Sequence, residues 1–185
     1  AAESLRPADL DEVYVSAGPG SFTGLRIGVT VARTLALAVE NLRCVGVPTA
    51  AAIAENVRDR PWENLAVVVE AKAGCVYATL FQRKDDAPVP AGEPRVAPLA
   101  DVLAAAPSPL LLVAPHLRKQ DLEAADVSLA ESSLAVRTVE GVWRAGRRLA
   151  RAGEFTDPRR LLPIYARRPE AVRLWEQRHG RQGKP

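Results

Sequence analysis

The first third of the chain alternates short apolar runs with helical patterns. Strands are predicted at residues 12–17 and 43–47, because β-branched residues are concentrated there and turn residues follow each run. A helix is predicted between them at 23–40, and Thr49 is the predicted N-cap of an alanine-rich helix at 50–57. This order of elements predicts an α/β fold built on a parallel βαβ unit.

A charged, proline-containing segment at residues 58–64 predicts a boundary between two lobes. Beyond it, strands at 65–71 and 75–82 form a predicted hairpin through Lys72-Ala73-Gly74. Further elements are predicted at residues 95–97 (strand), 99–105 (helix), 110–114 (strand) and 138–152 (helix). The predicted organisation is the remainder of an N-terminal lobe at 1–60, a C-terminal lobe at 61–170 and a basic tail at 171–185.

The helix predicted at 23–40 is apolar on nearly all of its faces. Between Thr23 and Val39 only Arg26 and Arg33 are charged. Small residues recur every four positions, at Gly20, Gly24, Gly28, Ala32 and Ala36. Such a helix is normally buried on most sides, and small residues let another element approach closely. We expect one side to cover the sheet and the rest to be covered by a missing N-terminal part, a partner subunit or both; a core helix without a partner remains the alternative.

The helix predicted at 138–152 separates an apolar face from a basic face. The apolar face contains Val139, Val142, Trp143, Gly146, Leu149 and Ala150, and the basic face contains Arg144, Arg147, Arg148 and Arg151. We interpret the arginines as a solvated helix face rather than a surface for RNA phosphates. Trp143 and Trp175 are assigned to packing.

The glycine-rich turn from Gly18 to Gly28 resembles a phosphate-binding loop only superficially. A Walker loop needs lysine and a hydroxyl at the helix start, and Gly24-Leu25-Arg26 supplies neither. A dinucleotide fingerprint needs a glycine where Thr23 stands. Ser21 lacks the flanking glycines of a nucleophile elbow.

The composition is that of an ordinary globular protein. The chain has 185 residues, a net charge of +3 and two cysteines, Cys44 and Cys75, which we expect to be reduced in a cytoplasmic protein. No apolar run is long enough for a membrane span. Because the chain contains no methionine and little precedes its first strand, we expect an N-terminal truncation.

The titratable residues do not form a recognisable catalytic or metal-binding pattern. The two histidines, His116 and His179, lie far apart in sequence, and no cysteine–histidine cluster has metal-ligand spacing. Carboxylates at Asp9, Asp11, Glu12 and Glu70 are expected to be solvated strand ends. We therefore expect no catalytic residue and no metal site in this chain.

Three stretches together resemble the TsaB (YeaZ) family: GPGSFTGLRIG at 18–28, VVVEAKAGCVYATLF at 67–81 and LLPIYARRPEA at 161–171. The resemblance implies an actin/Hsp70-like (ASKHA) ribonuclease H-like fold of two lobes, with the first strands and helix of the N-terminal lobe absent. It implies a non-catalytic scaffold subunit of the complex that transfers threonylcarbamoyl to the adenosine beside the anticodon of tRNA. The expected partners are TsaD and TsaE, with tRNA reached through the complex, and with ATP and metal bound by the partners alone.

The resemblance also assigns roles to residues of the first helix. It implies that the helix at 23–40 pairs with TsaD. The expected interface residues are Phe22, Gly24, Leu25, Gly28, Val29, Ala32, Arg33 and Ala36, preceded by the motif turn of Gly18, Pro19, Gly20, Ser21 and Thr23. A homodimer through the same helix, and an actin-like ATPase or glycoprotease-type metallohydrolase, remain alternatives. The chain departs from the family at Glu70-Ala71-Lys72, where Asp-Ala-Arg is usual.

Overall fold

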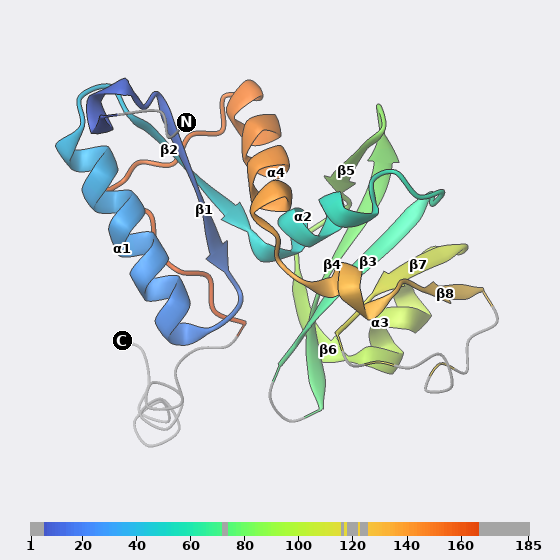
Figure 1. Cartoon of the computed structure of the whole chain (residues 1–185). Coiled ribbons are helices and arrows are strands. Elements are labelled where there is room, and N and C mark those ends of the chain that lie inside the picture. The colour runs from blue at the N-terminus through green and yellow to red at the C-terminus, as the bar shows by residue number, and fades with distance from the viewer. Residues whose placement is uncertain (1–5, 72–73, 116, 118–121, 123–125, 167–185) are drawn as a thin grey trace, which may run out of the picture.

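The first part of the molecule is the predicted βαβ unit. In the computed structural model, which describes residues 6–71, 74–115, 117, 122 and 126–166, β1 (Glu12–Gly18) and β2 (Arg43–Pro48) form a parallel pair. α1 (Phe22–Ala38) connects them and packs on this pair (Figure 1). The predicted strands and helix are confirmed.

The second part is a mixed sheet of six strands. It contains β3 (Asn64–Glu70), β4 (Cys75–Lys84), β5 (Ala87–Pro90), β6 (Arg95–Pro98), β7 (Leu110–Val113) and β8 (Val127–Leu129). The strand order is β5-β4-β3-β7-β8, with β6 also paired to β4. β3 and β4 form the predicted antiparallel hairpin, and β7 runs parallel to β3. The pattern failed to predict β5 and β8.

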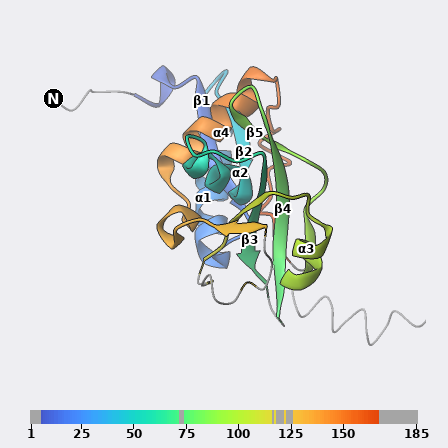
Figure 2. The same ribbon diagram turned by 90° about the vertical axis from the view of Figure 1, so that its right-hand side faces the viewer.

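Both faces of this sheet are covered, because side chains of a strand alternate between its two faces. Leu65 and Val67 of β3 belong to one core, with α2 (Thr49–Ala54) and α4 (Val139–Arg151). Ala66 and Val68 belong to a second core, under α3 (Leu99–Ala105). Figure 2 shows β3 and β4 between α2 and α4 on one side and α3 on the other.

α2 lies at the centre of the molecule and is entirely buried. It ends earlier than predicted, and a 3-10 turn (Glu55–Val57) follows. Thr49 is not an N-cap: it is the first residue of the helix, and its hydroxyl lies 3.2 Å from the Ser16 hydroxyl. The prediction failed because a buried contact with β1 determines where this threonine lies.

α4 approaches the neighbouring elements through glycines. A Cβ atom on Gly146 would lie 2.6 Å from the Tyr14 ring, and one on Gly141 would overlap the carbonyl oxygen of Ala52. Thr138 caps the helix: its hydroxyl accepts a hydrogen bond from the Gly141 amide at 2.9 Å. α4 therefore packs closely on both β1 and α2.

The segment after α4 returns to the first sheet. The Thr156 amide donates to the Cys44 carbonyl at 2.8 Å, and the Ile164 amide donates to the Ala17 carbonyl at 2.6 Å. Leu161 is buried against α1 and β2. The sequence pattern assigned α4 and this segment to the lobe at 61–170, whereas the structure packs both against β1 and β2. The tail predicted at 171–185 lies outside the described residues.

The structure also shows whether the two cysteines are buried and whether any helix could span a membrane. Cys44 is buried, Cys75 is half-buried, and both are free thiols. Burial raises the pKa of the Cys44 thiol. None of the helices in the described ranges is long and apolar enough to cross a bilayer.

Candidate functional site

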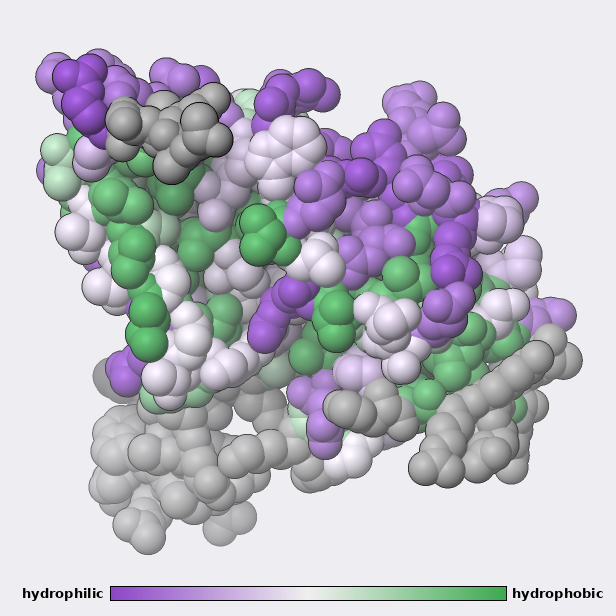
Figure 3. Space-filling view, viewed as in Figure 1, coloured by the Kyte–Doolittle hydropathy of each residue, from purple (hydrophilic) through white to green (hydrophobic). Residues whose placement is uncertain are grey.

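α1 buries one side and exposes the other. Leu25, Val29 and Ala32 are at most 5% exposed and face β1 and β2. On the opposite side, Ile27 is 61% exposed, and two further large apolar residues, Val31 and Leu37, are 53% and 56% exposed. Figure 3 shows hydrophobic side chains in a row along this helix.

The prediction that one side of α1 covers the sheet is confirmed, and within the described residues the opposite side is exposed. Spacings of three and four residues place Leu25, Val29 and Ala32 on a single helix face, and two strands cover only that face. Gly28, one of the small residues that recur every four positions, also faces the sheet. A Cβ atom on Gly28 would lie 3.5 Å from Val15 Cγ2. Ala36 packs partly against the same core.

The expected interface residues consequently divide into three groups. Leu25, Val29 and Ala32 are core residues of this chain, which corrects their assignment as contacts with a partner. Gly28, Arg33 and Ala36 are half-buried, while Phe22 and Gly24 are exposed. The residues that sequence reasoning omitted lie between these positions. We call them the outer face of α1: Ile27, Thr30, Val31, Thr34, Leu37 and Ala38, all exposed.

The motif turn before α1 has a structural role. Ser21 is the N-cap, and its hydroxyl accepts a hydrogen bond from the Gly24 amide at 3.4 Å. Gly18 has a φ of +114°, and a Cβ atom there would overlap the carbonyl oxygen of Ile164. Gly18 and Pro19 are buried, whereas Gly20 and Thr23 are exposed. The segment that follows α4 and contains Ile164 thus packs against the turn.

An aromatic cluster borders the exposed end of α1. The Phe22 and Tyr165 rings have centroids 5.6 Å apart, and the Arg26 guanidinium lies 4.6 Å from the Phe22 centroid. Phe22 remains 52% exposed. Phe22 and Tyr165 thus form an aromatic pair at the N-terminal end of α1, with the Arg26 guanidinium over the Phe22 ring.

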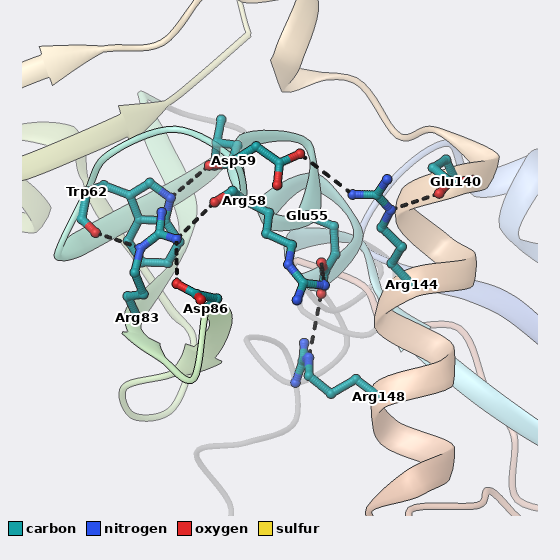
Figure 4. Close-up of polar contacts among 10 residues, drawn as sticks. Glu55, Arg58, Asp59, Trp62, Arg83, Asp86, Glu140, Arg144 and Arg148 are labelled. Atoms are coloured by element: carbon teal, nitrogen blue, oxygen red, sulfur yellow. Dashed lines mark hydrogen bonds and ion pairs between the residues drawn. The ribbon is translucent and has the colours of Figure 1, made fainter.

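A second feature is an arginine-rich pocket between α4 and the turn after α2 (Figure 4). Its volume is about 290 Å³. The lining residues are Glu55, Arg58, Ala87, Trp143, Arg144, Arg147, Arg148 and Arg151. We refer to this set as the arginine pocket.

A buried carboxylate organises the inner part of the arginine pocket. The Glu55 side chain is 1% exposed, and its oxygens lie 3.5 Å from Arg148 Nε and 3.9 Å from Arg58 Nη1. Nearer the surface, Arg144 Nε donates to Glu140 at 2.8 Å, and its Nη1 lies 4.0 Å from Asp59.

The backbone beside Arg58 is also held in place. Arg83 of β4 donates from Nη1 to the Arg58 carbonyl at 2.9 Å and from Nε to the Trp62 carbonyl at 3.0 Å. Its guanidinium lies 4.4 Å from the Trp62 ring centroid. Arg83 therefore fixes the connection between α2 and β3 from which Arg58 projects (Figure 4).

The arginine pocket corrects two interpretations of the sequence. The α4 arginines are not simply a solvated face, because four of them line a pocket around Glu55. Trp143 was assigned to packing, yet it is 47% exposed, and the Arg147 guanidinium lies 5.3 Å from its ring centroid. The buried positions of α4 are Gly141, Ala145 and Gly146, because only small residues fit so close to α2 and β1.

Two of the four carboxylates considered for catalysis, Asp9 and Glu12, take part in local contacts. Asp9 pairs with Arg6 at 3.0 Å, and this contact lowers the pKa of the Asp9 carboxyl. Glu12 pairs with Arg43 at 2.5 Å and accepts a hydrogen bond from the Tyr14 hydroxyl. In the described part of the chain, no three His, Cys, Asp or Glu residues are grouped to hold a metal ion. His116 and His179 lie outside the described residues.

Comparison with known proteins places the chain in a family. A family model described as "TsaD: tRNA N6-adenosine threonylcarbamoyltransferase" matches residues 1–141. The tRNA threonylcarbamoyladenosine biosynthesis protein TsaB of Bacillus subtilis (strain 168) is 30% identical over 188 residues, covering 92% of this chain and 76% of that protein. The TsaB protein of Escherichia coli (strain K12) is 35% identical over 79 residues, covering 42% of this chain and 34% of that protein.

Solved structures show the same fold. YeaZ from Pseudomonas aeruginosa superimposes with a TM-score of 0.75 at 22% identity, covering 87% of this chain and 76% of that chain. A Pseudomonas aeruginosa protein described as similar to peptidase YEAZ gives a TM-score of 0.74 at 24% identity, covering 88% and 76%. The architecture is thus of the actin-like ASKHA class, as the resemblance implied. Within that class, the chain belongs to the TsaB (YeaZ) family, a paralogue of TsaD.

Proposed function

We propose that this chain is a non-catalytic interaction subunit in the biosynthesis of threonylcarbamoyladenosine on tRNA, and that it docks a TsaD-type partner through the outer face of α1. The names of its relatives supply the pathway. The observation that supports the docking role is the exposure of Ile27, Val31 and Leu37, each more than half exposed on one helix face.

The chemistry of the outer face of α1 fits a helical partner. A contiguous apolar surface on a helix marks an interaction site more often than a solvated face. Thr30, Thr34 and Ala38 lie between the large residues, and small side chains allow a second helix to approach closely. This face contains no charged residue, so a partner helix that covers it need not neutralise one.

The proposed role comes with further partners, ligands and a cellular location. TsaE joins the pair, tRNA is bound in the complex, and ATP and metal are bound by the partners in the cytoplasm. When TsaD is absent, the same apolar face associates with a second copy of this chain. An actin-like ATPase or metallohydrolase is the alternative from a different functional class.

Val31→Asp tests the docking role directly. We expect loss of TsaD pairing in a pull-down, because the change places a charge at the centre of the outer face of α1. Charges at Gly28 or Val29 would be poorer probes, since both positions face β1. Val136→Asp is the matched control, because Val136 is 52% exposed and lies outside α1. Normal pairing of Val31→Asp would overturn the proposal.

Two further measurements separate the alternatives. Size-exclusion chromatography with and without TsaD distinguishes a homodimer from a heterodimer. Stoichiometric binding of ATP or a divalent metal by the isolated chain would favour the enzymatic alternative. We expect neither ligand to bind this chain by itself.

A further inference from the structure

We infer that the arginine pocket is a contact site for single-stranded RNA, in which arginines of α4 bind successive phosphates and Trp143 stacks on a base. This inference rests on the proposed function, which makes tRNA the substrate of the complex. The site lies on α4 and the turn after α2, away from the outer face of α1 (Figure 1).

The charge of the arginine pocket favours an anion. Five arginines and one carboxylate, Glu55, line it. Asp59 and Glu140 add two negative charges beside Arg144, which leaves a net charge of +2 (five arginines minus three carboxylates). Within the described ranges, Arg147 and Arg151 form no ion pair with a carboxylate, so both guanidinium groups are available to a phosphate.

The arrangement along α4 fits a strand rather than a single phosphate. Arg144, Arg147 and Arg151 extend over about 10 Å, because a helix rises by about 1.5 Å per residue. A row of this length is too long for one compact phosphate group, and it can meet more than one phosphate of a strand that runs along α4. Sites for one compact phosphate commonly use backbone amides at a helix N-terminus, whereas side chains from the middle and end of α4 line this pocket.

Trp143 supplies the second element of a single-strand site. It is nearly half exposed at the edge of the arginine pocket, with Arg147 against its ring. Sites for single strands combine a basic groove with exposed aromatic rings, because each base offers a flat surface for stacking. A tryptophan that served only to pack α4 would be buried.

Glu55 is a positioning residue for the arginines. With its side chain 1% exposed, it lies at the inner end of the arginine pocket, beneath Arg58 and Arg148. Among the described residues, Glu55 Oε2 and Arg148 Nε and Nη2 have no hydrogen-bond partner although they are buried. Buried polar atoms without partners are rare in folded proteins. Glu55 thus holds Arg58 and Arg148 at the inner end of the arginine pocket.

The first test measures binding of a fluorescent RNA hairpin that contains the anticodon loop to the full-length protein over a salt series. We expect Arg147→Ala/Arg151→Ala to weaken binding at low salt and to reduce the slope of log affinity against log salt by about 1.4, since each contact contributes about 0.7. Arg159→Ala/Arg160→Ala is the matched control. It removes the same charge from two exposed arginines outside the arginine pocket. An equal loss in the control would overturn the inference.

The second test addresses stacking and the source of the phosphate. Trp143→Ala should weaken RNA binding roughly 5- to 150-fold, and Trp143→Phe should restore most of it. Inorganic phosphate and ATP should compete only weakly with the hairpin. Strong competition by either, or unchanged RNA binding in Trp143→Ala, would overturn the inference. Unaltered circular dichroism and thermal melting of each variant establish that it is folded.

Failure of this inference is distinguishable from failure of the proposed function. Val31→Asp should lose TsaD pairing and retain binding of the RNA hairpin. Arg147→Ala/Arg151→Ala should retain TsaD pairing and lose RNA affinity. If the arginine variant alone loses TsaD pairing, the arginine pocket is a protein interface and the RNA assignment is wrong.

Discussion

Arg148 Nε lies 3.5 Å from Oε1 of Glu55, and this ion pair connects α4 to the turn that follows α2. The two residues are far apart in sequence, and each comes from an element that packs against the first sheet or the central core. Arg58 approaches the same carboxylate at 3.9 Å. The ion pair therefore links the stability of the central core to the shape of the arginine pocket.

Replacing Glu55 tests this link. Glu55→Ala removes a buried carboxylate and leaves Arg148 without its partner, which should lower the free energy of unfolding by about 3 kcal/mol, the lower end for breaking a buried pair. Arg148 retains 27% exposure, which is why we expect the lower end. Glu131→Ala, which breaks an exposed pair with Arg60, should cost less than about 1 kcal/mol. Denaturant unfolding measures both; equal costs would contradict the link.

The two sides of α1 predict opposite responses to the same type of truncation. Leu25→Ala removes a side chain that is 5% exposed and should destabilise the chain by about 2–5 kcal/mol. Ile27→Ala removes one that is 61% exposed and should change stability by less than about 0.5 kcal/mol. Chemical denaturation of the isolated chain gives both values. A large cost for Ile27→Ala would place that side chain in a core and remove it from the outer face of α1.

Much of the fold could be predicted from local pattern. The βαβ unit, the β3–β4 hairpin, α3 and α4 were predicted because their periodicity and bounding turn residues are strong. β5 and β8 were missed, since β5 contains Pro88 and Pro90 and β8 has only three residues. Both are ordered by pairing with longer strands, which local sequence does not reveal.

The outer face of α1 and the arginine pocket were harder to predict than the fold, because both depend on long-range packing. α1 is apolar on several sides, and nothing in its own sequence indicates which side covers the sheet. The four arginines of α4 were recognised as a basic face, but their relation to Glu55 requires α4 to pack on α2. Trp143 was misassigned because the fully buried positions of α4 are small residues, Gly141, Ala145 and Gly146.

Gly18 of the motif turn can be compared with Gly92, a glycine outside the turn that has nearly the same φ. Gly18 has a φ of +114° and Gly92 a φ of +115°. A Cβ atom on Gly18 would overlap the Ile164 carbonyl oxygen, whereas one on Gly92 would meet nothing within 4 Å. Gly92→Ala should therefore cost about 1–3 kcal/mol from backbone strain alone. Gly18→Ala should cost roughly 1–3 kcal/mol more, from overpacking against the returning segment. Thermal unfolding compares the two, and equal costs would show that this segment does not constrain the turn.

Tyr14 predicts a loss of stability at high pH. Burial, together with the hydrogen bond to the Glu12 carboxylate, raises the pKa of Tyr14 to about 12, whereas an unfolded tyrosine ionises near 10. Between these values the unfolded chain releases the phenolic proton while the folded chain retains it, so the free energy of unfolding must fall as the pH rises through that window. Tyrosinate absorbance of the wild type minus that of Tyr14→Phe should titrate with a pKa of about 12. Glu12→Gln should lower the Tyr14 pKa, because it removes the negative charge beside the phenol. A difference titration centred near 10 would mean that Tyr14 is neither packed against α4 nor hydrogen-bonded to Glu12 in solution.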